Sequence, residues 1–481
     1  MFFLDSPLLL VGDFSANAVN QIPELDCDCA CSTTPFQVSF GENSIRSFAV
    51  VADTYTTPLN PDFHLVFSPF APGGPSVLNA TGWQRYQDFV QHPQPLTQTF
   101  DRQLAQQNLI APQGISLQPQ PSSSQQLTVW LHVTNACNLD CPYCYVRKSS
   151  AVLDRTQGFT ILDQLFVTAQ QNGFRQIKLK YAGGEATLEF KLIQALHYYA
   201  QTLATKTGIE LKAVVLSNGT TLSPALVDWL EKNKVRLMVS LDGLGDVHDR
   251  QRPYRQGQPS FVAIAKKLDT LILPSQVDLH ISITVTSANA PHLADLIAWI
   301  LERDWKFSLN FYRVPPQKPL SQGFSLADAI LIAGIRSAYQ VIENYLPDRP
   351  LMNGLLDKVQ TTAHTHTCGV NQNYVVVTHE GKIAQCQMYL EQALPETIAK
   401  VSDRDLLKEL AQAPIQSLPV DQKSDCSACT YRYRCTGGCP AETFRFTGRW
   451  DLKSPHCQIY KALYPEVLRL EGLRLLKVNG F

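Results

Sequence analysis

The sequence of 481 residues has almost no net charge and no long apolar segment. Its 41 Lys and Arg nearly balance its 42 Asp and Glu, so no positive excess indicates binding to nucleic acid or to an anionic membrane. No apolar run reaches the roughly 18 residues that a membrane-spanning helix needs. The apolar start of the chain lacks a basic region, and Asp5 and Asp13 interrupt it, which argues against a signal peptide. We therefore expect a cytoplasmic protein that binds neither nucleic acid nor a membrane.

Cysteine, in contrast, is plentiful: there are 13 thiols, an odd number, and they are bunched along the chain. Bunching indicates metal sites in a reducing compartment more than a disulfide framework. In the first group, Cys27, Cys29 and Cys31 would point to one face of an extended chain. This group is either a metal or redox site or an accidental cluster of reduced thiols.

The densest group is Cys137, Cys141 and Cys144, spaced C-x3-C-x2-C directly after an apolar, strand-like run. Three thiolates can hold three irons of a [4Fe–4S] cluster, whereas a cluster that only carries electrons takes four. The missing fourth thiolate leaves one iron open for a ligand. A cofactor bound at that iron would then carry out the reaction, and the protein would position it.

Between residue 127 and about residue 315, β-branched runs alternate with helical periods. We expect strands at 127–133, 177–181, 213–216, 235–241, 279–285 and 308–312. Helices are expected at 159–171, 189–205, 223–233, 261–272 and 292–303. Six strand–helix units predict an α/β fold in which a parallel sheet curls into a partial barrel. In such folds the chemistry lies at the carboxyl ends of the strands.

Short motifs follow the first four of these strands. The first strand leads into the cysteine loop, where Tyr143 precedes the third thiol. The next three strands end in Gly183-Gly184-Glu185, Ser217-Asn218-Gly219 and Ser240-Leu241-Asp242-Gly243, and Arg252 comes soon after. Each motif alone has an ordinary explanation, because Gly-Gly and Asn-Gly pairs are common in turns. Their order on successive strand ends is what carries information.

Together with the cysteine loop, these motifs resemble the radical S-adenosylmethionine (SAM) superfamily. The resemblance implies that the amino and carboxylate groups of SAM bind the open iron, and that a 5′-deoxyadenosyl radical then abstracts hydrogen from a substrate. It also implies the SAM contacts: Tyr143 beside the adenine, Gly183 and Gly184 beside the ammonium, Glu185 balancing its charge, Ser217 and Asn218 near the ribose, and Ser240 and Arg252 near the carboxylate.

Seven further thiols follow in the C-terminal part: Cys368, Cys386, Cys426, Cys429, Cys435, Cys439 and Cys457. C-x2-C pairs also occur in structural zinc sites, although seven thiols divide poorly between two such sites. The spacing resembles the SPASM domain, an extension of radical SAM enzymes that binds two auxiliary [4Fe–4S] clusters. The resemblance implies three clusters in all. It assigns Cys426, Cys429, Cys435 and Cys457 to a fully ligated outer cluster, and Cys368, Cys386 and Cys439 to an inner one.

Two positions depart from the family pattern. Tyr374 stands where some members have an eighth Cys, so the inner cluster is open, bound by substrate, or completed by a group such as His364 or His366. Gln387 stands where sulfatase-maturating relatives carry an Asp that deprotonates the substrate. An amide cannot act as that base, which argues against formylglycine formation. Substitute bases could be Tyr389, Tyr374 or Glu380.

Residues 61–117 show a hairpin, a helical stretch that opens at Val77 and runs to Val90, and a second short helix through Leu109. This pattern resembles the small winged-helix modules that capture leader peptides by strand addition. The alternative is a structural cap on the next domain. A Gln-, Pro- and Ser-rich linker follows. The expected order is a segment of unknown role (1–60), this α+β module (61–117), the linker (118–126), the partial barrel (127–330), a helical bridge (331–365) and the SPASM domain (366–481).

The function predicted from these resemblances is maturation of a ribosomally made precursor peptide by a crosslink, a splice or another modification. The enzyme would take electrons from a low-potential donor such as flavodoxin or ferredoxin. One alternative is a radical SAM dehydrogenase or modifying enzyme that acts on a small molecule or a folded protein. The non-enzymatic alternative is an iron–sulfur electron carrier or scaffold.

Overall fold

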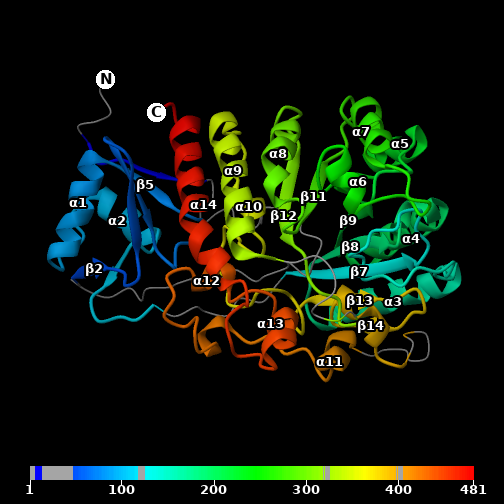
Figure 1. The fold of residues 1–481 in the computed structure, drawn as a ribbon. Helices are drawn as coiled ribbons and strands as arrows, with labels where there is room; N and C mark the ends of the chain where they lie inside the picture. The colour runs from blue at the N-terminus through cyan, green and yellow to red at the C-terminus, as the bar shows by residue number, and fades with distance from the viewer. Residues whose placement is uncertain are drawn as a thin grey trace.

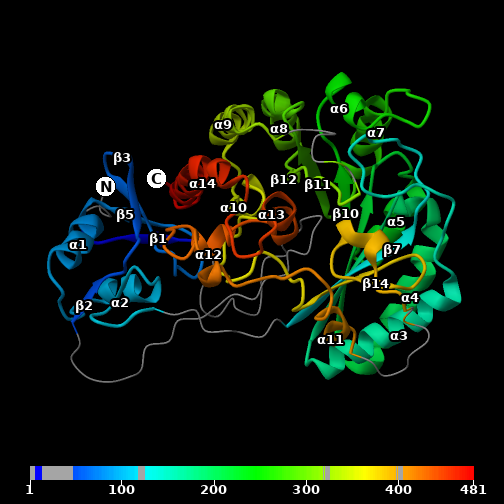
Figure 2. The same cartoon turned by 60° about the horizontal axis from the view of Figure 1, so that its bottom comes forward.

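The computed structural model describes residues 6–12, 47–117, 125–317, 319, 326–396, 398 and 405–481. Cys27, Cys29 and Cys31 lie outside the described residues. The chain forms an antiparallel N-terminal part, a parallel sheet with its helices, and a cysteine-rich C-terminal part (Figure 1). Figure 2 shows the N-terminal part and the parallel sheet on opposite sides, with C-terminal elements between them.

The central sheet has eight strands in the order β12-β11-β10-β9-β8-β7-β13-β14. Strands β7 to β12 pair in parallel, each with its neighbour in sequence. Their bounds are β7 Gln126–Thr134, β8 Gln176–Gly183, β9 Glu210–Ser217, β10 Arg236–Ser240, β11 Leu279–Val285 and β12 Lys306–Phe311. All six predicted strands therefore form. Because they are parallel, their carboxyl ends meet at one edge of the sheet.

Five predicted helices connect these strands, and they also form. Their bounds are α3 Arg155–Gln171, α4 Phe190–Thr207, α5 Pro224–Lys232, α7 Phe261–Lys267 with η3 Leu268–Ile272, and α8 Leu293–Leu301. Local sequence sets several ends: the Asp154 side chain accepts from Gln157 N, and Gly208 ends α4 with a left-handed φ of 71°. The short α6 (Asp246–Gln251) follows β10. These elements confirm an α/β partial barrel of the radical SAM type.

Apolar burial on the helix-covered face holds the sheet. Leu131, Leu179, Val215, Val239 and Ile281, one from each of five neighbouring strands, are all 0% exposed. The strand registers put these side chains on one face, where they form a single apolar core with the connecting helices. Each such side chain contributes about 1.5–3 kcal/mol relative to exposure. The core thus fixes the strand ends on which the polar motifs stand.

The N-terminal part contains an antiparallel sheet in the order β1-β5-β4-β3 and a two-stranded sheet of β2 and β6. The bounds are β1 Leu9–Val11, β2 Phe48–Val50, β3 Tyr55–Asn60, β4 Phe63–Phe67, β5 Ser76–Asn79, α1 Ala80–Gln91, α2 Thr99–Gln106 and β6 Ile110–Pro112. The helix expected from Val77 begins instead at Ala80, because Ser76 to Asn79 pair with β4 and the Asn79 side chain caps the helix. The sheet also contains β1 and β3, which precede residue 61. The module boundary at residue 61 remains a prediction.

The C-terminal part attaches to the barrel through the sheet itself. Its elements are α9 Asp328–Tyr345, α10 Met352–Leu355, β13 Tyr374–Val377, β14 Ile383–Ala384, η5 Gln387–Gln392, α11 Leu406–Leu410, η7 Val420–Gln422, α12 Arg432–Cys435, α13 Pro440–Thr447 and α14 Cys457–Val478. Strand β13 pairs in parallel with β7, with Val376 opposite Trp130. Helix α14 packs on α9 and on the N-terminal sheet (Figure 1). Within the described ranges, no helix has the length and apolar character to cross a membrane.

Candidate active site

One cavity lies at the carboxyl edge of the barrel strands and extends to the cysteine-rich part. It encloses about 1680 Å³, including its open mouth. Every predicted SAM-site residue lines it: Cys137, Cys141, Tyr143, Cys144, Gly183, Gly184, Glu185, Ser217, Asn218, Ser240 and Arg252. So do the three thiols of the predicted inner cluster, Cys368, Cys386 and Cys439. Residues separated by up to about three hundred positions therefore share one chamber.

The cysteine loop is held by its own backbone. Cys144 N donates to Cys141 O at 3.0 Å, and Leu139 N donates to Cys137 Sγ at 3.4 Å. Burial raises the pKa of Cys137, and it raises the pKa of Cys141 to about 12. Thiols that burial keeps protonated need a bound cation to become thiolate ligands, and iron supplies that charge. The loop thus fits a cluster with three protein ligands.

The described residues show no mononuclear metal site: no group of three or more His, Cys, Asp or Glu side chains there is gathered to hold one ion. Thiolates on one tetrahedral zinc would lie about 3.8 Å apart, since each Zn–S bond is about 2.3 Å. In a [4Fe–4S] cluster each thiolate binds a different iron, so the sulfurs lie farther apart. Thiolates serve both kinds of site, and the seven C-terminal thiols divide poorly between two four-ligand zinc sites.

The glycines of the second motif serve the protein's own backbone. Gly184 N donates to Thr134 O at 2.8 Å, and Glu185 N donates to Ala136 O at 2.7 Å. A Cβ on Gly183 would lie 2.6 Å from Thr134 O, and one on Gly184 would collide with the carbonyl of Ala136. The glycines thus let the end of β8 lie directly on the start of the cysteine loop. Their proximity to SAM remains a prediction.

Glu185 joins two strand ends. Its buried carboxylate accepts from Ser217 Oγ at 2.9 Å, from Asn218 N at 2.5 Å and from Thr187 N at 3.1 Å. Burial raises the pKa of Glu185 above its usual value, and these donors oppose the rise. Asn218 Nδ2 in turn donates to Asn138 Oδ1 at 2.9 Å, which ties the end of β9 to the cysteine loop.

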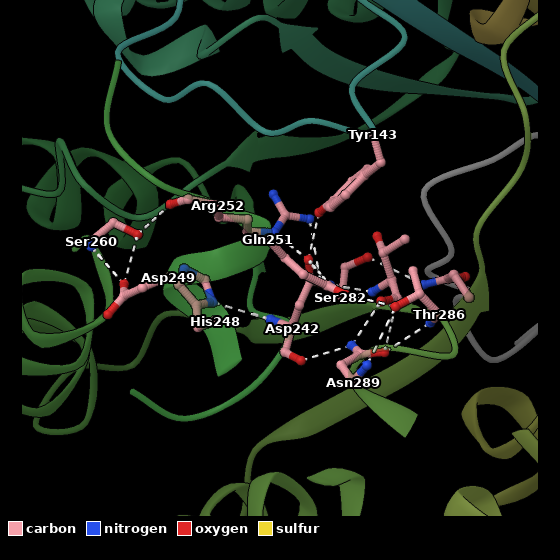
Figure 3. A network of polar contacts seen from close by, with 12 residues as sticks. Tyr143, Asp242, His248, Asp249, Gln251, Arg252, Ser260, Ser282, Thr286 and Asn289 are labelled. Atoms are coloured by element: carbon pink, nitrogen blue, oxygen red, sulfur yellow. Dashed lines mark hydrogen bonds and ion pairs between the residues drawn. The ribbon is translucent and has the colours of Figure 1, made fainter. Parts of the chain in front are cut away.

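Asp242 is the centre of the polar network in Figure 3. Its Oδ2 accepts from Arg252 Nε at 2.7 Å and from Tyr143 Oη at 2.5 Å. Its Oδ1 accepts from Thr284 N at 2.8 Å, and Gln251 Nε2 also donates to Oδ2, at 3.1 Å. Burial raises the pKa of Asp242, but the charge and hydrogen bond of Arg252 together with the other donors outweigh burial, so the pKa is lowered overall.

This network sets the positions of two predicted SAM contacts. The Arg252 guanidinium lies 5.4 Å from the centroid of the Tyr143 ring, so both side chains depend on the same carboxylate. Behind it, Thr286 Oγ1 donates to Gln251 Oε1 at 2.7 Å, and Asn289 Nδ2 donates to the Asp242 carbonyl at 2.8 Å. Sequence reasoning quoted the Ser-Leu-Asp-Gly motif but missed its Asp as a positioning residue.

The inner thiols face the same cavity from the other side. Burial raises the pKa of Cys386 to about 12. The two suggested completing ligands, His364 and His366, do not line the cavity. His364 is fully buried with Nδ1 2.9 Å from Thr362 O, and His366 Nδ1 lies 2.9 Å from Thr365 Oγ1. Neither histidine is therefore among the residues that share the cavity with the three inner thiols.

The three suggested bases are placed differently. Tyr389 lines the cavity, and Tyr374 is buried in β13. Glu380 pairs with Lys382 Nζ at 2.5 Å, does not line the cavity and has an exposed side chain. Sequence reasoning missed Glu442, which lines the cavity at the start of α13 and is only 8% exposed. Its position three residues after Cys439 was the available signal.

The four predicted outer thiols meet at a second, smaller cavity. It encloses about 450 Å³ and is lined by Cys426, Cys429, Cys435 and Cys457. Burial raises the pKa of Cys426 to about 11 and of Cys435 to about 12. The fold thus places these four thiols at one cavity and Cys368, Cys386 and Cys439 at the other. Which of them bind iron remains a proposal.

Residues 131–272 match the Radical SAM superfamily. An uncharacterized protein of Methanocaldococcus jannaschii is 30% identical over 194 residues, which span 39% of this chain and 63% of that protein. The serine-type anaerobic sulfatase-maturating enzyme of Klebsiella aerogenes is 23% identical over 357 residues, 68% of this chain and 83% of that enzyme. Among solved structures, native anSMEcpe with bound AdoMet and Cp18Cys peptide has a TM-score of 0.59 at 18% identity. That match covers 72% of this chain and 99% of the other.

Proposed function

Residues 131–272 carry a radical SAM domain, so the chain is a radical SAM enzyme related to the sulfatase maturases, and we propose that it modifies a ribosomally made precursor peptide. The observation that carries the proposal is the shared cavity. It brings the cysteine loop and the three inner thiols to a common chamber open to substrate.

The proposed cofactors are SAM and three [4Fe–4S] clusters. When bound at the cysteine loop, SAM would supply the radical chemistry that removes a hydrogen atom from the substrate. Cys137, Cys141 and Cys144 would hold the first cluster, with Tyr143, Gly183, Gly184, Glu185, Ser217, Asn218, Ser240 and Arg252 around SAM. The inner and outer thiol groups would hold the auxiliary clusters, and a low-potential donor such as flavodoxin or ferredoxin would supply electrons.

A peptide substrate is favoured by two observations. The related anSMEcpe structure contains a bound peptide as well as AdoMet. In this chain, β3 is an edge strand of the N-terminal sheet. Edge strands can bind an extended peptide through backbone hydrogen bonds. The division into leader-binding module, barrel and SPASM domain is part of this proposal.

Glu442 is the proposed proton acceptor. Two carboxylates, Glu185 and Glu442, line the cavity in the described part of the chain. Glu185 is already engaged by hydroxyl and backbone donors, whereas Glu442 lies at the first turn of α13, with Oε1 3.5 Å from His456 Nε2. After hydrogen abstraction, a substrate that gives one electron to an auxiliary cluster must also lose a proton. Glu442 can accept it within the cavity.

Formylglycine formation is not the proposed reaction. Gln387 lines the cavity at the position of the relatives' catalytic Asp, and an amide does not accept a proton at neutral pH. The reaction would instead be a crosslink, a splice or a related modification of a side-chain or α carbon.

The test is co-expression with small precursor-peptide genes from the same genomic neighbourhood, followed by high-resolution mass spectrometry of the peptide. A loss of about two hydrogens would establish a crosslink, and a large loss would establish excision. If every peptide returns unmodified while the anaerobically reconstituted enzyme still cleaves SAM, the peptide assignment is wrong. A small-molecule or folded-protein substrate is then favoured.

A further inference from the structure

A buried lysine lies between the two groups of C-terminal thiols. Lys423 is only 1% exposed, and its Nζ donates a hydrogen bond to Thr436 O at 2.8 Å. Burial lowers the pKa of Lys423, and nearby thiols, once ionised, raise it. Cys426 and Cys435 of the outer group and Cys368 and Cys439 of the inner group are the thiols whose ionisation would raise the pKa of this ammonium.

The backbone over Lys423 is the segment that joins the two groups. Cys435 and Cys439 are connected by Thr436, Gly437 and Gly438, which have φ angles of 48°, 79° and 73°. Three consecutive left-handed residues make a tight turn, and the non-glycine among them is strained by about 1–3 kcal/mol. The strain is offset by hydrogen bonds to Thr436 O, which also accepts from Thr367 Oγ1 at 3.0 Å.

Gly437 shows how closely this turn covers the lysine. A Cβ there would lie 2.8 Å from Lys423 Cδ, 3.0 Å from Lys423 Nζ and 3.2 Å from Cys426 Sγ. The ammonium and an outer thiol thus meet at the same backbone position. Only glycine leaves room for both and adopts the required φ without strain.

A buried ammonium is costly unless anions compensate it. Each auxiliary cluster with its thiolates would be such an anion, and its charge becomes more negative by one unit when it takes an electron from the substrate radical. Net charge and burial set the potentials of iron–sulfur clusters. At low dielectric a fixed positive charge near two clusters acts on both.

We propose that Lys423 is a shared counter-ion of the two auxiliary clusters and raises the reduction potential of both. No proton transfer is involved: the lysine stays cationic while one electron enters either cluster. The effect favours electron transfer from the substrate radical to either auxiliary cluster. This inference rests on the auxiliary clusters of the proposed function.

The experiment is an anaerobic redox titration monitored by electron paramagnetic resonance. The full chain carries Cys137→Ala, Cys141→Ala and Cys144→Ala, so that only auxiliary clusters contribute. In this background Lys423→Met should lower the reduction potential of both auxiliary clusters. At a fixed applied potential, the ratio of reduced to oxidised cluster should fall about tenfold, which corresponds to a potential shift of about 59 mV for a one-electron couple. Lys423→Arg keeps the charge, so the reduced-to-oxidised ratio of each auxiliary cluster should stay within about twofold of the ratio in the parent protein.

The matched control is Lys453→Met, because Lys453 lines the outer cavity but its side chain is 47% exposed. Its charge is screened, so this change should shift neither potential appreciably. Iron content and spectra of the parent protein establish first whether two auxiliary clusters exist, which tests the proposed function separately. With both clusters present, unchanged potentials in Lys423→Met, or a shift of only one, contradict the inference. If Lys423→Met loses a cluster, the test falls to Lys423→Arg. A shift of either auxiliary potential in Lys423→Arg then contradicts the inference, and unchanged potentials support it.

Discussion

The hydroxyl of Tyr374 donates a hydrogen bond to Oε1 of Gln387, 2.9 Å away. These are the two positions at which the chain departs from the family pattern, so the departures are one coupled feature. Tyr374 is fully buried in β13, whereas Gln387 lines the cavity beside Cys386. The tyrosine stands where the family resemblance places an eighth thiol, and it donates to the amide that stands where the relatives carry the catalytic base.

Removing this hydroxyl tests that coupling. Tyr374→Phe should lower peptide turnover about fivefold to tenfold, because a hydrogen bond that orients Gln387 contributes about 1 kcal/mol. SAM cleavage without peptide should be unchanged. The control is Tyr199→Phe, whose hydroxyl donates to Asp163 at the exposed surface. Equal turnover in the two variants would show that the Tyr374 contact has no role in substrate positioning.

Loss of a thiol from the cysteine loop should stop the reaction at its first step. Cys141→Ala should lose about a third of the bound iron if all three proposed clusters are present, and it should form no 5′-deoxyadenosine, because two thiolates do not hold an open-iron cluster. The measurements are iron per chain and chromatography of SAM products. Continued 5′-deoxyadenosine formation would rule out the assignment of this loop.

Loss of an outer thiol should have a different result. Cys429 lines the second cavity, away from the SAM-site residues. Cys429→Ala should therefore keep 5′-deoxyadenosine formation within about threefold but reduce the modified peptide by about 100-fold or more, since the proposed exit for the substrate electron is lost. A variant that still modifies peptide at the original rate would make the outer cluster dispensable.

The Asp242 network should control SAM binding. Asp242→Asn leaves the buried Arg252 charge without its anion, a change that costs about 3–5 kcal/mol in buried pairs. We expect at least a tenfold weaker SAM affinity in equilibrium dialysis, with iron content retained. Asp246→Asn, at an exposed position in the first turn of α6, is the control and should bind SAM normally. Unchanged SAM affinity in Asp242→Asn would show that the ion pair with Arg252 does not contribute to SAM binding.

If Glu442 is the proton acceptor, its loss should uncouple SAM cleavage from peptide modification. Glu442→Gln should lower peptide turnover by about 100-fold, the lower range for loss of a general base, while SAM cleavage persists. Glu380→Gln removes an exposed carboxylate outside the cavity and should have little effect. Both rates are followed by mass spectrometry of peptide and 5′-deoxyadenosine. Full turnover by Glu442→Gln would transfer the role of base to another group, such as Tyr389.

The sequence by itself predicted the barrel and the identity of its key side chains. Apolar periods are local, so all six strands and five connecting helices form within a few residues of their predicted places. Motifs on parallel strands must meet at one edge, and for that reason Cys137, Glu185, Ser217 and Arg252 line one cavity. The start of α1 was predicted too early, because strand pairing of Ser76 to Asn79 with β4 overrides local helical periodicity.

Only the tertiary structure decided contacts between distant segments. Asp242 binds Tyr143 across 99 positions, and Glu442 reaches the barrel cavity from a helix after the last inner thiol. Lys423 lies against the loop that joins the two thiol groups. Such contacts depend on how β13 pairs with β7 and how the C-terminal turns pack, and periodicity carries no information about them. Spacing therefore predicted side chains that line the two cavities, and packing decided which other side chains contact them.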